Sequence, residues 1–224
     1  DKPFDKKLFK EQKAEFKVAM DHLDAGDEFL QYIPINEIGV LTSLEKQGMN
    51  FRSAVGEYLK AYKFNPNSAD LNYKIGICYY NFDKFKMKKY FERAYQLKPT
   101  VVKEIHFYIG MGHHLNGDWQ KAINEYNAFG STAPVDYIDL KILATKKVQE
   151  CKNGQKLESQ KARVWIDNLG KSINTKYPDY APVISTDEAI MIFTARRPDQ
   201  EEMSPFGGYF EDLYKSSRTD GVWS

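Results

Sequence analysis

Three histidines lie close together in the middle of the chain, and their spacing invites a metal-binding interpretation. His106 and His113 are seven residues apart, which places them on one face of a helix, and His114 follows directly. Zinc sites usually have three or four protein ligands. No nearby cysteine, aspartate or glutamate completes a recognisable set in the sequence. We therefore interpret the histidines as a polar helix surface and predict neither a metal site nor another cofactor.

Sequence motifs for catalysis are absent. The chain has no G-x-S-x-G nucleophile elbow, no H-E-x-x-H zinc motif and no glycine-rich phosphate loop. Acidic pairs such as Glu201-Glu202 fall in expected loops, where they are solvated. Arg196-Arg197 follows a predicted strand, and we expect it to hold the next loop through a carboxylate rather than to bind an anion. The sequence predicts a non-enzymatic protein with no catalytic residues.

Pairs of helices must position any functional side chain. Residues 103–134 predict two antiparallel helices joined by a tight turn at Asn116-Gly117-Asp118. Small residues let the two backbones approach closely, large ones fill the space beside them, and a proline ends the second helix. The anchors in this role are Gly110, Gly117, Ala122, Tyr126, Phe129 and Pro134.

The same spacing recurs upstream in the chain. It is found at Gly76, Met87, Phe91, Ala94 and Pro99, and its second half at Ala54, Tyr58, Ala61 and Pro66. These positions resemble the tetratricopeptide (TPR) repeat, whose period is about 34 residues. The resemblance implies a mainly α fold, a TPR-like α-solenoid of about three repeats plus flanking helices, with repeats at 35–68, 69–102 and 103–136.

The individual helices follow from caps and apolar periodicity. Residues 5–24 predict a helix that Gly26-Asp27 ends, and the first repeat is expected to begin with a helix at Ile35–Gln47 after an interruption at Pro34. The further expected helices are Phe51–Phe64 with Asn50 as N-cap, Ala69–Tyr80 with Ser68 as N-cap, and Lys84–Leu97.

A terminal helix should cover the apolar face of the last repeat. Tyr137–Cys151 is amphipathic, and we expect four of its residues to face inward and Lys152-Asn153-Gly154 to close it. The expected inward residues are Ile138, Ile142, Leu143 and Val148.

A partner-binding groove is expected on the first helices of the second and third repeats. In a TPR array these helices line the concave face, and aromatic side chains there provide contact area at low entropic cost. The aromatic groove could equally pack against other parts of the chain. The predicted groove residues are Tyr73, Lys74, Ile77, Tyr80, Phe107, Tyr108, Met111 and His114.

Composition limits the classes of partner. The chain has 224 residues, 42% hydrophobic residues and a formal net charge of +1, which favours a packed core and gives no sign of a nucleic-acid-binding domain. The chain has no run of about 18 apolar residues, so no membrane span is predicted. Cys78 and Cys151 lie in different expected helices, so no disulfide is expected between them.

The pattern changes after the helices. From Arg163 the hydrophobic period is two, and strands are expected at Pro182–Ser185, Ala189–Ala195, Glu211–Ser216 and Val222–Trp223, with turns at Thr186-Asp187-Glu188 and Thr219-Asp220-Gly221. Arg196–Gly208 is expected to be a loop. The expected domains are a TPR-like helical domain at 1–152, a linker at 153–162 and a β segment at 163–224.

The β segment resembles the first blade of a WD40-like (PD40, TolB-related) β-propeller. The resemblance rests on Ile166–Gly170, Ile173-Asn174, Tyr177–Ser185, Ile192–Arg197, Glu211–Tyr214 and Asp220–Ser224. The order of modules is similar to Bacteroidetes envelope proteins that join TPRs, a PD40 propeller and an OmpA-like peptidoglycan-binding domain, a group that includes PorE-type components of type IX secretion and gliding machinery.

That resemblance implies a non-enzymatic scaffold or adaptor in the periplasm, associated with the outer membrane and compatible with a lipoprotein. Its groove would bind a protein partner from the envelope or secretion machinery, and peptidoglycan would be bound only through an OmpA-like domain not in this chain. Two alternatives stay open: a cytoplasmic TPR co-chaperone-like adaptor, and an accessory module of a propeller-containing peptidase.

Overall fold

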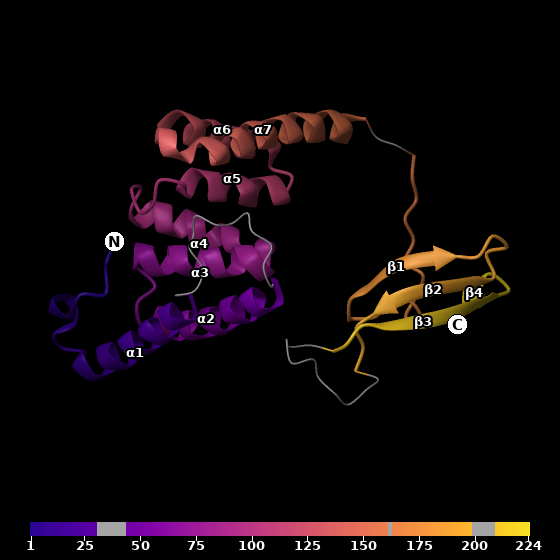
Figure 1. The fold of residues 1–224 in the computed structure, drawn as a ribbon, viewed down its shortest axis with the longest axis horizontal. Helices are drawn as coiled ribbons and strands as arrows, with labels where there is room; N and C mark the ends of the chain where they lie inside the picture. The colour runs from indigo at the N-terminus through magenta and orange to yellow at the C-terminus, as the bar shows by residue number, and fades with distance from the viewer. Residues whose placement is uncertain (31–43, 161–162, 199–208) are drawn as a thin grey trace. The chain divides into compact units, whose positions relative to one another are not determined.

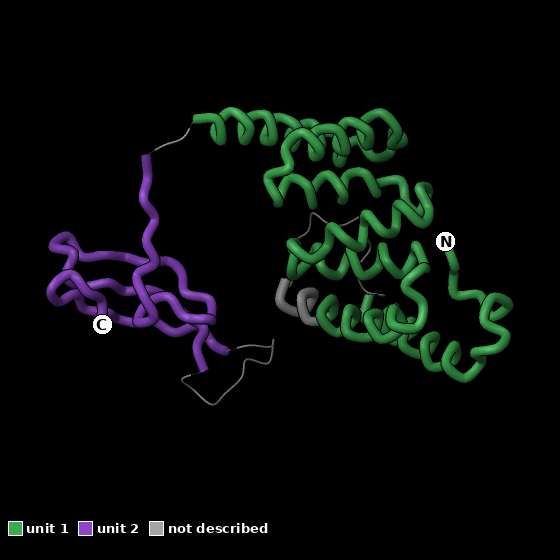
Figure 2. The backbone as a smooth tube through the Cα atoms, turned by 180° about the vertical axis from the view of Figure 1, so that it is seen from behind, with its two compact units in different colours: residues 1–161 green, residues 162–224 purple. Residues whose placement is uncertain are grey.

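The computed structural model describes residues 1–30, 44–160, 163–198 and 209–224, with the backbone only for 44–49. The described residues are mainly helical, and a small curled antiparallel sheet of four strands lies in the C-terminal part (Figure 1). The chain divides into two compact units, a helical unit of residues 1–161 and a sheet unit of residues 162–224 (Figure 2).

The helical unit is a stack of helices in which neighbours in sequence are neighbours in space (Figure 1). Three pairs form antiparallel hairpins, namely α1 with α2, α3 with α4 and α5 with α6, and α7 packs against α6. The elements are η1 (Lys6–Phe9), α1 (Lys13–Leu30), α2 (Leu44–Phe64), α3 (Ala69–Phe82), α4 (Lys84–Leu97), α5 (Ile105–Leu115), α6 (Trp119–Thr132), η3 (Val135–Tyr137) and α7 (Ile138–Ser159).

Each hairpin is closed by the same contact, a glycine of the first helix against an aromatic ring of the second. The pairs are Gly26 with Tyr58, Gly76 with Phe91, and Gly110 with Tyr126. A Cβ atom added at Gly26 would lie 2.4 Å from Cε1 of Tyr58, and one added at Gly110 would lie 2.9 Å from Cδ1 of Tyr126. Real side chains do not approach this closely, so the absence of a side chain sets the spacing of the two helices.

This contact corrects the expectation for the N-terminal region. Gly26-Asp27 does not end the first helix, because α1 continues to Leu30. Glycine in a helix interior costs about 1 kcal/mol relative to alanine, but here it admits the buried ring of Tyr58. The first helix of the first hairpin is therefore α1. Of the helix expected at Ile35–Gln47, the residues up to 43 lie outside the described residues, as does Pro34, and residues 44–47 belong to α2.

The second and third hairpins follow the prediction closely. Ser68 is the N-cap of α3 and its Oγ accepts a hydrogen bond from the amide of Leu71 at 3.2 Å. The tight turn after α5 places Gly117 at a φ of +73°, the left-handed region that glycine favours. The helix expected to start after Asn50 begins earlier, at Leu44, so Asn50 is inside α2 and not its cap.

The terminal helix α7 differs from its prediction in length and orientation. Gly154 does not close it, since the helix runs to Ser159 and Gly154 lies against the indole of Trp119, where an added Cβ would be 3.0 Å from ring atoms. The inward face is formed by Ala144 and Cys151, with Val148 partly buried beside them. Three residues expected to face inward are instead exposed: Ile138, Ile142 and Leu143.

The sheet unit is a meander of four antiparallel strands in the order β1-β2-β3-β4. The strands are β1 (Asp179–Ile184), β2 (Ile190–Ala195), β3 (Asp212–Thr219) and β4 (Val222–Trp223), all close to their predicted positions. Asp220 and Gly221 join β3 to β4 with φ values of +49° and +83°, as in tight hairpins. Residues 163–178 contain no strand, although the period-two pattern begins at Arg163.

One face of this sheet has a small core of Met191, Phe193, Ala195 and Trp223, covered by Ile173. The two arginines after β2 bind carboxylates, as expected, and these carboxylates lie in β1 and directly before β3. Nη2 of Arg197 lies 2.8 Å from Oδ1 of Asp179, and Arg196 pairs with Glu211. The residues 199–208 of the expected loop lie outside the described residues.

Two further expectations agree with the described residues. Cys78 and Cys151 are both free and buried. None of the helices described is long and apolar enough to cross a membrane.

Candidate functional site: the first-helix face

The predicted groove residues lie on α3 and α5, the first helices of two neighbouring hairpins. The structure divides them into a buried and a half-exposed group. The buried group is Tyr73, Ile77, Phe107 and Tyr108, and the half-exposed group is Lys74, Tyr80, Met111 and His114.

The buried rings belong to the core of the helical unit. Tyr108 stacks on Phe91 with ring centroids 4.8 Å apart, and Tyr73 lies edge-on to Tyr108 at 6.2 Å. Phe107 contacts Tyr126 and Phe129, both fully buried. These rings hold α3, α4, α5 and α6 together. They lie buried beneath the first-helix face and offer a partner little accessible surface.

Lys74 already has partners within the chain. Its Nζ lies 2.8 Å and 2.9 Å from the two carboxylate oxygens of Asp27 and 3.2 Å from Oδ2 of Asp70. Burial alone would lower the pKa of Lys74, but the two carboxylates outweigh burial and raise that pKa. Tyr58 also donates its hydroxyl to Asp27 at 2.6 Å. Lys74 therefore links α3 to α1 and α2 while a quarter of its side chain stays exposed.

The remaining half-exposed residues form a mostly uncharged surface. Nδ1 of His114 lies 3.3 Å from the hydroxyl of Tyr126, and burial lowers the pKa of His114, with nearby Lys147 adding to the effect. Burial therefore favours the neutral imidazole. Tyr80 has Nζ of Lys84 at 5.2 Å from its ring centroid. A phenol, an imidazole and the thioether of Met111 are suited to apolar and hydrogen-bonding contacts with a partner.

A buried carboxylate lies at the start of α5. Glu104 accepts hydrogen bonds from the hydroxyls of Tyr73 at 3.2 Å and Tyr137 at 3.3 Å. The sequence analysis placed Tyr73 in an open groove, whereas the fold makes its hydroxyl a partner of this carboxylate. Glu104 thus ties α3 to the segment that leads into α7.

A second polar cluster joins α4, α5 and the start of α6. Oδ2 of Asp118 lies 3.0 Å from Nδ1 of His113 and 3.1 Å from Nζ of Lys88, and Nε2 of His113 lies 3.5 Å from Oε1 of Glu92. The hydrogen bonds to His113 and Lys88 lower the pKa of Asp118 to about 2. This cluster links two hairpins and accounts for the position of His113.

The histidines also reveal a repeated histidine–glutamate contact that the sequence analysis missed. Nδ1 of His22 lies 2.7 Å from Oε2 of Glu57, and Nδ1 of His106 lies 2.7 Å from Oε2 of Glu125. Each histidine is four residues before the hairpin glycine, and each glutamate directly precedes the ring that packs on it. An alignment on Gly26 and Gly110 would have shown this pairing.

In the middle hairpin the same position holds Asn72. Its amide nitrogen donates to the carbonyls of Pro66 and Ser68, and its buried Oδ1 has no protein partner in the structure. Among the described residues, no group of three or more histidine, cysteine, aspartate or glutamate side chains is placed to hold a metal ion. The histidines of α5 instead contact Glu125, Asp118 and Tyr126.

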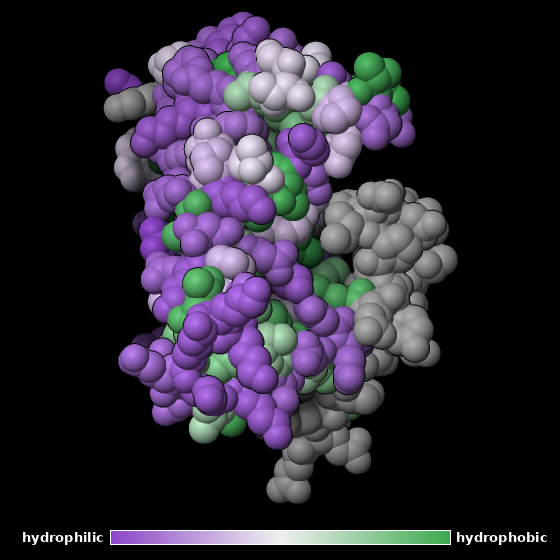
Figure 3. Space-filling view, turned by 90° about the vertical axis from the view of Figure 1, so that its left-hand side faces the viewer, coloured by the Kyte–Doolittle hydropathy of each residue, from purple (hydrophilic) through white to green (hydrophobic). Residues whose placement is uncertain are grey.

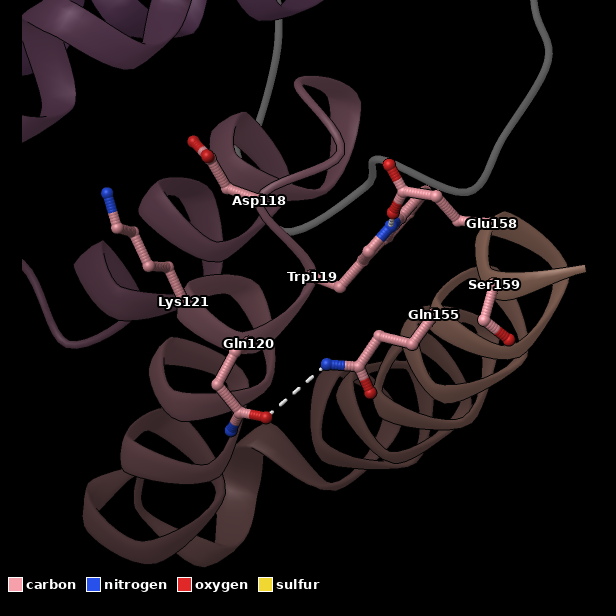
Figure 4. A pocket seen from close by; sticks show the side chains of 7 residues that line it. All are labelled: Asp118, Trp119, Gln120, Lys121, Gln155, Glu158 and Ser159. Carbon is pink, nitrogen blue, oxygen red and sulfur yellow. Dashed lines mark hydrogen bonds between the residues drawn. The ribbon is translucent and has the colours of Figure 1, made fainter. Parts of the chain in front are cut away.

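A hollow of about 560 Å³ lies between the start of α6 and the end of α7 (Figure 4). The indole N–H of Trp119 donates to Oε2 of Glu158 at 2.6 Å, and the amide of Gln155 donates to Oε1 of Gln120 at 3.4 Å. Asp118, Lys121 and Ser159 complete the lining. The hydrogen bonds across the hollow join the two helices, so its walls are fixed by contacts within the chain.

The side of the molecule seen in Figure 3 is mainly hydrophilic with small separated hydrophobic spots. The half-exposed residues of the first-helix face are the candidate contact points for a partner. Comparison of the chain with protein-family models and with curated proteins gives no match.

Proposed function

We propose that the protein is a non-enzymatic scaffold that binds a protein partner on the first-helix face of α3 and α5. The observation that carries this proposal is the repeated glycine-to-ring contact, which spaces three successive hairpins in the same way. Regular stacking of helical hairpins is typical of solenoids whose first helices form a continuous binding surface. On this view the hairpins are TPR-like repeats, the first of them formed by α1 and α2.

The sheet unit supports a second part of the proposal. Its strands form a four-stranded meander with apolar side chains on both faces: one face carries the small core, and Val183, Ile192 and Leu213 on the other are exposed. A sheet with two apolar faces is suited to lie between other sheets, as a propeller blade does. The assignment to the periplasm and to type IX secretion or gliding machinery rests on the resemblance to PorE-type envelope proteins.

The test is capture of a partner by the full chain from an envelope extract, with variants in the half-exposed group. We expect Met111→Glu together with Tyr80→Ala to abolish capture. Phe85→Ala is the matched control, because Phe85 is an exposed aromatic residue on α4, a second helix. Alanine in place of the buried Tyr73 or Phe107 would be uninformative, since emptying such core positions costs about 3–5 kcal/mol.

Circular dichroism must first show that each variant is folded. If the double variant and Phe85→Ala both fail to capture the protein that the wild type captures, the contact is not specific to the first-helix face and lies on another surface. Equal capture by all forms would also contradict binding at the first-helix face. If the wild-type chain captures no envelope protein, the scaffold proposal itself fails.

A further inference from the structure

The start of α7 carries an aliphatic stripe that faces away from the helical core. Val135 is 84% exposed, Ile138 55%, Ile142 63% and Leu143 37%. Val135 lies in η3, directly before α7, and the spacing of Ile138, Ile142 and Leu143 puts these three on one half of the surface of α7. The other exposed large hydrophobic residues of the described helical unit are spread along it, at Leu8, Val18, Phe29, Phe85, Leu115 and Leu157. The stripe is thus a local concentration of apolar surface.

The opposite side of α7 packs against the rest of the helical unit. Ala144 and Cys151 are buried against the rest of the helical unit, which fixes the rotation of α7 about its axis. The stripe therefore cannot turn inward without exposing these residues. A second protein surface packed on the stripe would remove it from water.

Charged residues flank the stripe in an ordered way. Asp136 and Asp139 are exposed at its N-terminal end, and Lys146 and Lys152 are exposed at its C-terminal end. Lys146 is only loosely paired, with Nζ 3.9 Å from Oε1 of Glu150 and 71% of its side chain exposed. The exposed charged residues are therefore acidic at one end of the stripe and basic at the other, while Lys141 and Glu150 are half-exposed.

We propose that this stripe binds the same stripe of a second copy of the chain, with the two α7 helices antiparallel and Ile142 at the two-fold axis. Asp139 is three residues before that centre and Lys146 four residues after it, which corresponds to about 4.5 Å and about 6 Å along the helix. Antiparallel pairing therefore brings Asp139 of one copy opposite Lys146 of the other, twice in the symmetric dimer. Parallel pairing would bring like charges together.

This self-complementarity distinguishes a second copy from an unrelated partner. An isologous dimer needs one patch that complements itself under two-fold rotation, and an apolar centre with opposite charges on its two sides meets that condition. A contact formed by one helix from each copy is smaller than the area of stable interfaces, so the dimer should be weak. The proposal does not depend on the proposed function, although two linked copies would raise the avidity for a repeated partner.

The first measurement is the mass of the full chain in solution by sedimentation, over concentrations from about 1 µM to about 1 mM, the range in which weak dimers form. We expect a reversible monomer–dimer equilibrium. Ile142→Glu should raise the dissociation constant of the dimer at least about 100-fold, because it places two carboxylates next to each other at the two-fold axis. Phe85→Glu, which adds the same charge at an exposed residue 75% accessible on α4, should leave it unchanged.

Charge reversal tests the pairing itself. Asp139→Lys should weaken the dimer, and Asp139→Lys combined with Lys146→Asp should restore it, because both changes then meet across the axis. As an independent readout, Ile142→Cys should form an intermolecular disulfide under mild oxidation much faster than Leu157→Cys, an exposed residue of the same helix outside the stripe. Circular dichroism confirms that the variants fold.

A monomer at all concentrations would overturn the proposal and assign the stripe to a different protein. A dimer that survives Ile142→Glu would overturn it as well, since the copies would then meet on another surface, such as the exposed face of the sheet unit. A dimer that the double charge reversal fails to restore would exclude the antiparallel arrangement.

Discussion

Replacement of Gly76 by alanine tests whether the glycine-to-ring contact sets the spacing of the hairpins. An added Cβ would lie 2.6, 2.8 and 2.9 Å from three ring atoms of Phe91, which is fully buried. Overpacking a filled core typically costs about 1–3 kcal/mol. Alanine is favoured over glycine in a helix by about 1 kcal/mol. Because the buried ring must shift against its neighbours, we expect overpacking to outweigh the gain in helix propensity, with a net loss of up to about 2 kcal/mol in the free energy of unfolding.

The matched control is Gly56→Ala, the same substitution in the interior of α2. Nothing lies within 4 Å of a Cβ added at Gly56, so only the helix propensity changes. We expect this variant to be more stable than the wild type by about 0.5–1 kcal/mol. Urea unfolding followed by circular dichroism at the helix signal measures both variants, and the two shifts should have opposite signs.

A double substitution separates the contact from other effects. Phe91→Leu removes the ring edge, so the cost of Gly76→Ala should fall when Leu occupies position 91, giving a positive coupling between the two sites. The reasoning is refuted if Gly76→Ala stabilises the protein as much as Gly56→Ala does. It is also refuted if the effects at 76 and 91 are simply additive.

Three further predictions concern the polar contacts. Asp118→Asn should remove part of the acid sensitivity of the helical unit. The pKa of Asp118 is about 2 in the fold against an ordinary 3.8, so the ionised carboxylate stabilises the fold above pH 4 and this stabilisation is lost as the pH falls toward 2. The urea midpoint measured against pH would show the difference. Arg197→Lys should cost the sheet unit about 1.5–3 kcal/mol, because lysine cannot donate two hydrogen bonds to Asp179 in the same geometry, and faster amide exchange in β2 would show the loss. Trp119→Phe removes the donor to Glu158 and should increase amide exchange in the last turn of α7, while unchanged exchange there would mean that the hydrogen bond does not hold the helix end.

The sequence determined the elements whose signals are local. The Ser68 cap, the left-handed turn at Gly117 and the proline spacing placed α3 to α6 within two residues of their observed ends at nearly every boundary. The strands of the sheet unit were predicted from period-two patterning for the same reason, since side chains alternate between faces. These signals depend on neighbouring residues and need no knowledge of distant contacts.

Tertiary packing decided which way the helices face and where two of them end. Gly26 and Gly154 are both helix-ending residues by local propensity, yet each lies inside a helix because a distant ring, Tyr58 or Trp119, packs on the bare backbone. A rule based on local sequence includes the low helix propensity of glycine. It does not include the ring contact from a distant residue that offsets this propensity.

The candidate site shows the same division. Amphipathic spacing identified α3 and α5 as helices with an aromatic face, but Tyr73, Phe107 and Tyr108 are core residues because rings of α4 and α6 pack on them. In α7 the pattern predicted that Ile138 and Ile142 face inward, but the packing of the side with Ala144 and Cys151 leaves them facing solvent. Periodicity gives a helix its apolar sides, whereas the neighbours present in the fold determine which of those sides is buried.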